Sequence, residues 1–155
     1  MAGIAPVQAE SVASGLSVIE VQPTKGRAAK TGYTRAQFGP TWADVDRNGC
    51  DTRNDILKRD LTGEIFKEKT RDCVVLSGTL IDPFSGESIN FVRGNVSSME
   101  VQIDHVVALS NAWQTGAFKL SIKERTAFAN DPLNLLAVKG LSLIHISEPT
   151  RQAEI

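Results

Sequence analysis

Asp104 and His105 stand next to each other where the apolar segment 101–103 ends, and Asn134 follows 29 residues after His105. A carboxylate is a ligand for hard divalent cations, and an imidazole that is neutral near pH 7 can take a proton from water. Side by side, the two suit the hydrolysis of a phosphodiester, in which a base activates water while a cation holds the phosphate. On its own such a pair is weak evidence, because short motifs are frequent by chance.

A longer, ordered series of motifs surrounds this pair. In chain order the series comprises segments 33–39, 42–44, 47–57, 73–80, 82–86, 101–109, 112–113 and 116–117. Over roughly residues 25–138 the series resembles the secreted HNH endonucleases common in actinobacteria, the DUF1524-type nucleases. This resemblance implies an α+β fold, with a ββα-metal (HNH, or His-Me finger) nuclease core and an N-terminal elaboration made of a helix and a β-hairpin.

The resemblance also implies a role for each motif residue. His105 is the expected general base, and Asp104 is the expected ligand of a divalent metal, most simply Mg²⁺, with Mn²⁺ or Zn²⁺ as alternatives. Asn134 matches the middle Asn of the HNH motif, which orders the loop that holds the base. Each residue also has a simpler interpretation. His105 is then a buried, hydrogen-bonded histidine, Asp104 a strand-end cap or salt-bridge partner, and Asn134 a residue that orders a turn.

The third position of the motif is where this sequence departs from the family. The resemblance predicts a metal-binding Asn or His about nine residues after Asn134, at the start of a final helix, and Leu143 stands at that place. From about residue 140 onward nothing resembles the family. We expect 140–155 to be foreign sequence joined to a truncated domain, with His145 only a remote substitute for the missing ligand and Pro149 interrupting any helix. The chain as written is therefore predicted to be a poor nuclease.

Length and charge restrict the possible functions further. The 155 residues correspond to about one domain, and the net charge is −1. Proteins that bind nucleic acid tightly usually have a basic excess, so a local basic groove or the metal must supply the attraction here. Candidate phosphate contacts are Arg35, Arg53 and Arg125, because guanidinium binds phosphate bidentately; each is also a possible salt-bridge partner.

Cys50 and Cys73 are the two cysteines of the chain, and they do not form a Cys-x-x-Cys motif. Such a pair fits one disulfide in an oxidising compartment, which the resemblance to secreted proteins supports. The bond would close a loop of 24 residues, counting both ends, and contribute on the order of 3 kcal/mol to stability. The alternative is two unpaired buried thiols, since free Cys packs as a small hydrophobe.

The N-terminus leaves two interpretations open. Residues 1–9 are apolar and 7–9 resemble the end of a signal peptide, but a charged n-region and a full h-region are missing. The segment is either a signal peptide cut short by the chosen start or a disordered leader. No stretch approaches the ~18–20 apolar residues of a membrane span. We expect a secreted protein with a leader or linker at 1–30, an HNH endonuclease domain at 31–139 that is incomplete at its C-terminal end, and a tail at 140–155.

Sequence periodicity predicts the elements that position the motif residues. Thr34 and Gln37 predict a capping box for a short turn that Gly39 and Pro40 stop, and Ser121 and Glu124 predict another at the start of a helix. Ser110 is the predicted cap of the helix before it. The remaining predicted elements are a strand at 17–21, a helix at 53–61 ended by Gly63, a hairpin of 73–80 and 89–92 around a turn at 82–86, a strand at 101–107 and a strand at 135–138.

One acidic motif does not belong to this scheme. Segment 44–49 followed by Asp55 has the spacing of an EF-hand calcium loop, with Asp in place of the terminal Glu. Asp51 stands where such a loop has an apolar residue, and Pro40 disfavours an entering helix. We therefore interpret the segment as a turn that leads into the helix at Arg53.

The residues together predict a metal-dependent endonuclease that hydrolyses DNA, with RNA as a second candidate substrate. No obligate protein partner is evident. The alternative, from a different functional class, is a non-catalytic secreted binding or structural domain that has lost its last metal ligand.

Overall fold

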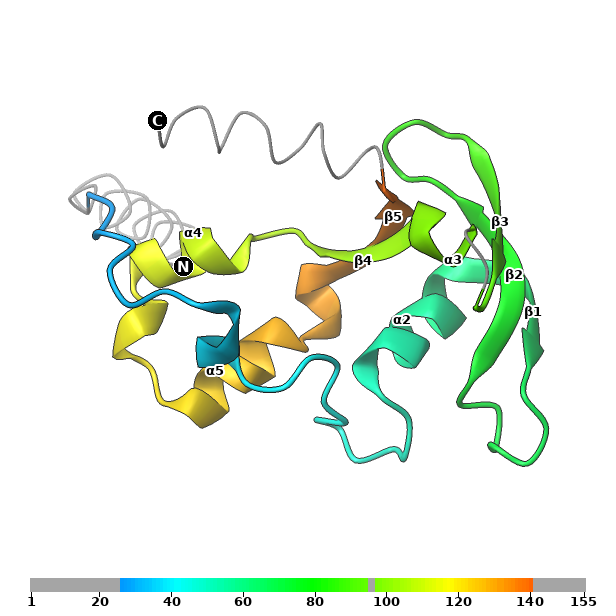
Figure 1. Ribbon diagram of the computed structural model, residues 1–155, viewed down its shortest axis with the longest axis horizontal. Helices are drawn as coiled ribbons and strands as arrows, with labels where there is room; N and C mark the ends of the chain where they lie inside the picture. The colour runs from blue at the N-terminus through cyan, green and yellow to red at the C-terminus, as the bar shows by residue number, and fades with distance from the viewer. Residues whose placement is uncertain (1–25, 95–96, 141–155) are drawn as a thin grey trace, which may run out of the picture.

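The computed structural model describes residues 26–94 and 97–140, in which short helices surround two small antiparallel sheets (Figure 1). The predictions for the strand at 17–21 and for Leu143, His145 and Pro149 lie outside the described residues. None of the described helices is long and apolar enough to cross a membrane.

The larger sheet has the order β1-β2-β3, with β1 (Leu61–Phe66), β2 (Val75–Ile81) and β3 (Ser88–Val92) antiparallel. The predicted hairpin is present as β2 and β3. In β3, buried Ile89 and Phe91 alternate with exposed neighbours, as expected for a strand with one face on the core.

The strand β1 is where the sequence prediction was wrong. Helix α2 (Thr52–Asp60) ends before Leu61, and Gly63 lies inside β1 rather than ending the helix. Buried Leu61 pairs with Leu80 of β2, so the tertiary environment holds this segment extended. Gly63 has φ +62° and lies at an irregularity of the strand register, a conformation that glycine adopts without a steric penalty.

The second sheet consists of β4 (Val101–His105) and β5 (Leu135–Lys139), which pair antiparallel with Asp104 opposite Leu136 and His105 opposite Leu135. Its inner face packs with α2 and the larger sheet in the main core. The predicted strand at 101–107 ends two residues early, at His105. The ββα-metal core stays a prediction, because residues 141–155 lie outside the described part of the chain.

A second core lies among the helices that follow β4, drawn in yellow and orange in Figure 1, and the short 3-10 turn that precedes α2 in the chain. Its elements are η1 (Arg35–Phe38), α4 (Leu109–Thr115), η2 (Ala117–Lys119) and α5 (Ile122–Ala129). Fully buried Phe38 lies at its centre, with ring contacts to Tyr33, Trp113 and Phe128.

Two of the three capping predictions need correction. The Ser121–Glu124 capping box of α5 is confirmed. Ser110 lies inside α4, whose N-cap position is Ala108 and has no side-chain cap. Thr34 precedes a 3-10 turn and its side chain does not cap it. Four-residue η1 leaves fewer free backbone N–H groups for a cap to bind than a full helix does.

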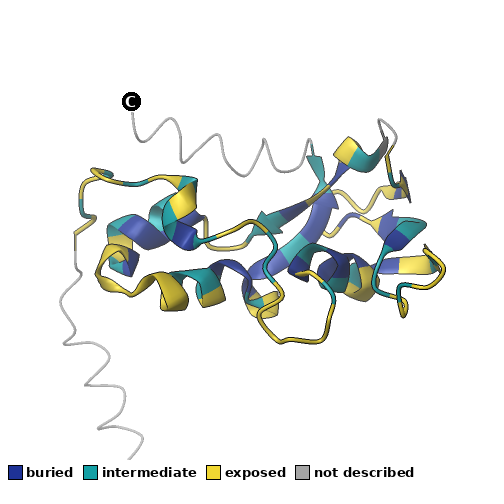
Figure 2. Cartoon of the chain, turned by 60° about the horizontal axis from the view of Figure 1, so that its bottom comes forward, coloured by how far each residue is buried: buried dark blue, intermediate teal, exposed yellow. Residues whose placement is uncertain are grey.

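Two further short elements precede the strands of the second sheet, α3 (Ser97–Glu100) before β4 and η3 (Pro132–Asn134) before β5. The predicted disulfide is present: Cys50 and Cys73 are bonded, with their Cα atoms 5.1 Å apart. Figure 2 shows buried residues along the middle of the molecule and exposed residues on the outer turns. The end of β4 lies where the two cores meet.

Candidate functional site

His105 ends β4 with its imidazole in a defined orientation. The ring nitrogen Nε2 lies 2.9 Å from the carbonyl oxygen of Ala129, the last residue of α5. A carbonyl oxygen can only accept a hydrogen bond, so Nε2 must carry the proton in this contact. The neutral ring therefore has its lone pair on Nδ1, which is the atom able to take a proton from water.

The surroundings of His105 keep the ring neutral. Burial lowers the pKa of His105, the hydrogen bond to Ala129 opposes this, and the positive charge of Arg35 lowers the pKa further. The ring of Trp42 lies parallel to the imidazole, with an interplanar angle of 7° and centroids 6.4 Å apart. A neutral imidazole at pH 7 is the form that acts as a general base.

Asp104 precedes His105 and faces a small cavity. Neighbouring strand residues point to opposite faces, and Asp104 lies on the face of Leu136 and Val138 rather than on the core face. One carboxylate oxygen accepts a hydrogen bond from the backbone N–H of His105 at 2.8 Å. Burial raises the pKa of Asp104, against the lowering effect of that hydrogen bond.

The cavity has a volume of about 270 Å³ and is mostly apolar. It is lined by Phe84, Asp104, His105, Val106, Leu136 and Val138. Asp104 is the one carboxylate among these residues. Mg²⁺ keeps several waters and is held by one or two carboxylates together with substrate phosphates, so a single half-buried Asp fits this metal. Among the described residues, no group of three or more His, Cys, Asp or Glu side chains is placed to hold a metal by itself.

Asn134 organises the loop that follows His105. Its side-chain oxygen accepts from the backbone N–H of Val107 at 2.7 Å, and its side-chain nitrogen donates to the Val107 carbonyl at 3.3 Å. The backbone carbonyl of Asn134 accepts from Val106 at 2.9 Å. Asn134 is 8% exposed, its side chain is hydrogen-bonded to this loop, and it does not line the cavity beside Asp104.

The three candidate arginines differ in position. Arg35 is close enough to His105 for its charge to affect the imidazole, and it donates to the Gly39 carbonyl at 3.2 Å. Arg53 lies on α2, where burial and the charge of Arg93 lower its pKa. Of the three, only Arg35 is brought to His105 by a contact or charge interaction in the described chain.

Arg125 is occupied by the protein itself. Its guanidinium donates to the Gln37 carbonyl and side chain and to the Leu120 carbonyl, and it lies 5.5 Å above the Trp113 ring. These contacts join η1 to α5 across the second core. The phosphate-binding role of Arg125 stays a prediction, with little of the guanidinium edge left for it.

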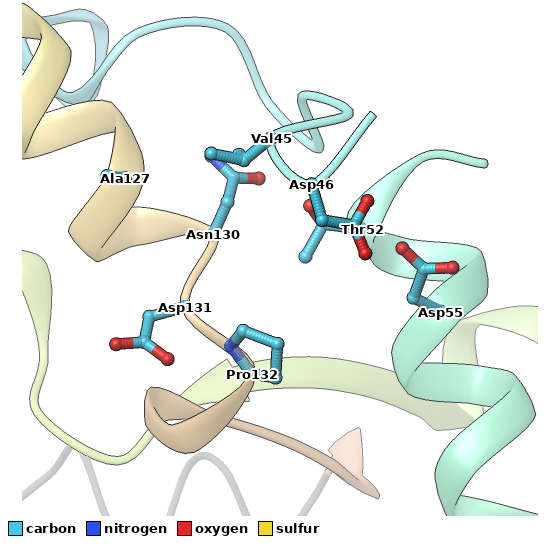
Figure 3. A pocket seen from close by; sticks show the side chains of 8 residues that line it. All are labelled: Val45, Asp46, Thr52, Asp55, Ala127, Asn130, Asp131 and Pro132. Atoms are coloured by element: carbon cyan, nitrogen blue, oxygen red, sulfur yellow. The ribbon is translucent and has the colours of Figure 1, made fainter. Parts of the chain in front are cut away.

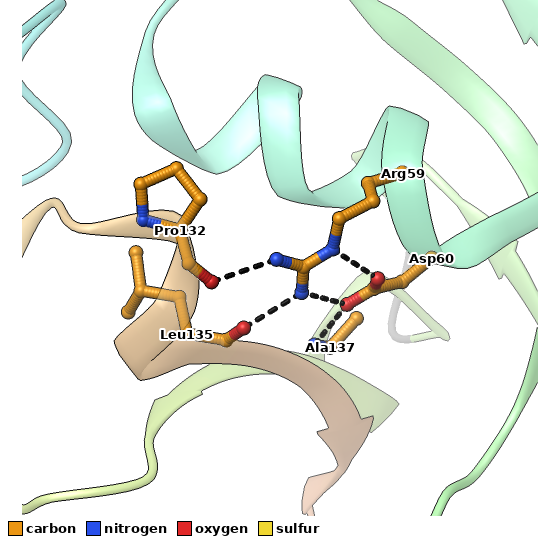
Figure 4. A network of polar contacts seen from close by, with 5 residues as sticks. All are labelled: Arg59, Asp60, Pro132, Leu135 and Ala137. Atoms are coloured by element: carbon orange, nitrogen blue, oxygen red, sulfur yellow. Dashed lines mark hydrogen bonds and ion pairs between the residues drawn. The ribbon is translucent and has the colours of Figure 1, made fainter. Parts of the chain in front are cut away.

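Sequence reasoning did not find the groups that hold the site together. The Ala129 carbonyl is a backbone group without a sequence signal, and nothing in the sequence placed Trp42 beside His105. Arg59 was also missed: it donates to the carbonyls of Pro132 at 2.7 Å and Leu135 at 2.6 Å, on either side of Asn134 (Figure 4).

Asp60 completes that network. Its carboxylate binds Arg59 at 2.6 and 2.8 Å and accepts from the backbone N–H of Ala137 at 2.8 Å (Figure 4). The end of α2 therefore fixes η3 and β5 through two adjacent side chains. An acidic–basic pair at a helix end is a common surface feature, so the sequence alone did not single it out.

The comparisons with known proteins agree with a nuclease-related family. The family model described as GmrSD restriction endonucleases, C-terminal domain, matches residues 51–141. A protein of Arthroderma benhamiae named "Uncharacterized secreted protein" is 35% identical over 132 residues, which cover 84% of this chain. The chain spans about half the length, 56%, of this curated relative. No solved structure matches the chain. The matched region contains Asp104, His105 and Asn134.

Proposed function

The chain belongs to the family of GmrSD restriction endonuclease C-terminal domains, and from this premise we propose that it is a secreted, metal-dependent endonuclease of the HNH type. The proposed reaction is hydrolysis of phosphodiester bonds in DNA, with RNA as a second candidate. The observation that carries the proposal is the hydrogen bond from His105 Nε2 to Ala129, because it leaves Nδ1 free to accept a proton.

His105 acts as the general base in this proposal. Nδ1 takes a proton from the attacking water, and the resulting imidazolium keeps its hydrogen bond to the Ala129 carbonyl. Trp42 and the loop ordered by Asn134 restrict the ring and the chain behind it. A base fixed in this way loses little orientational freedom when the substrate binds.

Asp104 holds the metal in this proposal. A bound divalent cation would neutralise the charge that develops on the phosphate and its leaving oxygen. Burial raises the pKa of Asp104, against the hydrogen bond from the backbone of His105 and the charge of its ring. A cation at this position would favour its ionised form. Arg35 adds a positive charge near His105, which would attract a phosphate.

Secretion rests on two observations. The relative from Arthroderma benhamiae is named a secreted protein, and the Cys50–Cys73 disulfide is stable in oxidising compartments. The substrate in this proposal is therefore nucleic acid outside the cell.

One observation favours a second candidate function, a non-catalytic secreted binding or structural domain. Asp104 is the one acidic residue at the cavity, and no group of metal-binding side chains forms around it in the described chain. If the metal needs a further protein ligand, the fold persists without activity.

Plasmid nicking by the purified chain separates the two functions. We expect weak cleavage that depends on Mg²⁺, Mn²⁺ or Zn²⁺, that EDTA abolishes, and that His105→Ala lowers by roughly 10²–10⁴-fold. Glu68→Gln, a change of one exposed charge, is the matched control and should cleave like the wild type. No cleavage with any of the three metals would support the non-catalytic domain. Equal cleavage by folded His105→Ala would remove His105 from the mechanism.

A further inference from the structure

The loop before α2 and the first turn of α2 bring four side chains together, those of Asp44, Asp46, Asn48 and Asp55. The side-chain nitrogen of Asn48 lies 3.0 Å from a carboxylate oxygen of Asp46 and 3.0 Å from one of Asp55. Asp44 turns its carboxylate toward the same loop and accepts from the backbone N–H groups of Asn48 at 3.1 Å and Gly49 at 3.0 Å. An amide nitrogen thus stands between two carboxylates, where a positive group is electrostatically favoured.

The backbone of this loop is wound tightly around those side chains. Arg47 has φ +59° and Gly49 has φ +88°, both in the left-handed region. The side-chain oxygen of Asn48 accepts from the backbone N–H of Cys50 at 2.7 Å. The first, third, fifth and twelfth positions of an EF-hand loop correspond to Asp44, Asp46, Asn48 and Asp55, with Gly49 at the sixth. These contacts describe the loop and do not by themselves show that it binds an ion.

An adjoining pocket, whose walls are mostly apolar, brings three carboxylates together beside the loop. The pocket has a volume of about 330 Å³ and is lined by Val45, Asp46, Thr52, Asp55, Ala127, Asn130, Asp131 and Pro132 (Figure 3). Three of these residues are acidic and none is basic. No described Lys or Arg forms an ion pair with the carboxylates of Asp46, Asp55 or Asp131. The pocket therefore favours a cation or a group rich in hydrogen-bond donors.

Asn130 gives independent evidence for an absent partner. It is 3% exposed, and its side-chain oxygen is buried without a hydrogen-bond partner among the described residues. Its side-chain nitrogen is satisfied by the Thr126 carbonyl at 2.9 Å. Figure 3 shows the oxygen on the side of the pocket that faces Asp46 and Thr52. A buried acceptor without a donor costs about 1–3 kcal/mol, and water bound to a cation is such a donor.

We propose that the loop 44–55 is a calcium site. Asp44, Asp46, Asp55 and the side-chain oxygen of Asn48 provide the oxygen ligands, and the ion takes the place of the Asn48 amide nitrogen between Asp46 and Asp55. The pocket holds the waters that complete its shell, next to Asn130. Ca²⁺ accepts six to eight oxygen ligands in flexible geometry, whereas Mg²⁺ requires a near-ideal octahedron.

The two features that disfavoured calcium in the sequence have structural explanations. Asp51, in place of an apolar residue, is the N-cap of α2 and accepts from the backbone N–H of Asn54 at 2.8 Å. No helix of the described chain enters the loop directly, and the disulfide of Cys50, at the seventh position, ties the loop to Cys73 instead. The helix that carries Asp55 begins at Thr52, as in the exiting helix of an EF-hand.

Calorimetric titration of the full chain with CaCl₂ tests the proposal, together with the thermal unfolding midpoint. We expect one ion per chain, with a dissociation constant on the order of 10⁻⁴–10⁻³ M, as in extracellular calcium modules. At about 10 mM Ca²⁺ the midpoint should rise by roughly 3–11 °C. Asp46→Asn and Asp55→Asn should each lower the affinity at least ~10-fold.

Two matched variants make the result specific. Glu68→Gln removes one exposed negative charge elsewhere and should bind Ca²⁺ like the wild type. Asp104→Asn removes the carboxylate of the proposed nuclease site and should also leave calcium binding unchanged. Absence of binding up to about 10 mM, binding that survives Asp46→Asn and Asp55→Asn, or an equal response to Mg²⁺ would each overturn the proposal. None of these outcomes depends on nuclease activity.

Discussion

Asn130 and Asn134 are four residues apart, both are buried, and their side chains are used very differently. Asn134 binds the loop after His105 with both its oxygen and its nitrogen. Asn130 uses only its nitrogen, and its oxygen beside the acidic loop has no partner among the described residues. The side chain of Asn134 thus has both its oxygen and its nitrogen bonded within the protein, whereas Asn130 lies in a region with an excess of acceptors.

The difference separates two kinds of site. The His105 site is held in place by the chain itself, through the Ala129 carbonyl, the Trp42 ring and the Asn134 side chain, so it is organised before any ligand arrives. The loop 44–55 contains four carboxylates, and three of them, Asp44, Asp46 and Asp55, surround Asn48, so their mutual repulsion favours a cation there. Burial, with the charges of Asp46 and Asp44 adding to it, raises the pKa of Asp55 against its hydrogen bond from Asn48.

Breaking the disulfide should damage the acidic loop more than the His105 site. Replacing both Cys50 and Cys73 by Ser should lower the free energy of unfolding by about 3 kcal/mol, because the unfolded chain is no longer restricted by the 24-residue loop. The Ca²⁺-dependent rise in the unfolding midpoint should shrink as well. Urea unfolding with and without Ca²⁺ measures both effects, and coincident curves for the variant and the wild type would contradict the expectation.

Replacing each asparagine by Ala compares the two regions directly through the loss of stability. Asn134→Ala should cost about 1–3 kcal/mol, because it leaves the buried backbone groups of Val107 without partners. Asn130→Ala should cost about 1 kcal/mol or less without calcium, since it removes one hydrogen bond and one unpaired oxygen together.

Calcium should reduce the difference between the stability costs of the two variants. At saturating Ca²⁺, Asn130→Ala should lose more stability relative to the wild type than it does in EDTA, whereas the cost of Asn134→Ala should not change. Urea unfolding of the two variants under both conditions gives these four values. Equal costs for the two variants in EDTA would remove the basis for distinguishing the regions.

The effect of pH on stability should be smaller, and opposite in sign for His105 and Asp104 of the proposed nuclease site. Burial holds the pKa of His105 below its ordinary value near 6.5. The unfolded chain therefore binds the histidine proton first, and stability falls as the pH drops below about 6.5 toward the lower, folded-state pKa. Asp104 has a raised pKa through burial, so its contribution increases as the pH falls through that raised value.

His105→Asn should remove the loss of stability just below pH 6.5. Unfolding midpoints of the variant and the wild type at about pH 7.5 and 5.5 give the comparison, and the difference between the two proteins excludes groups they share. An unchanged slope would mean that His105 has the same pKa in the folded and unfolded chains.

The elements predicted correctly have strong local signals. The capping box at Ser121 and the turn between β2 and β3 depend on residues only a few positions apart. Strand β1 was missed because Gly63 resembles a helix terminator, and its extended form depends on pairing with β2, which the local sequence does not encode. The sequence therefore predicted an element correctly where contacts between residues close in sequence determine its conformation.

The same reasoning applies to the sites. Asp104, His105 and Asn134 were found because they are adjacent or lie in a recognisable order, whereas the Ala129 carbonyl and Arg59 act through backbone groups. The acidic loop was visible in the sequence and was interpreted as a turn. Its pocket depends on Asn130 and Asp131, about 80 residues away, which only the fold brings next to Asp46 and Asp55.

The tautomer and pKa of His105 test the central claim most directly. In a long-range ¹H–¹⁵N spectrum of the imidazoles, His145→Gln assigns the only other histidine of the sequence. We predict that at about pH 7.5 Nε2 of His105 is protonated and Nδ1 is not, and that the ring titrates below its ordinary pKa of about 6.5. A proton on Nδ1, or a pKa above that value, would contradict the assignment of His105 as a base held ready by Ala129.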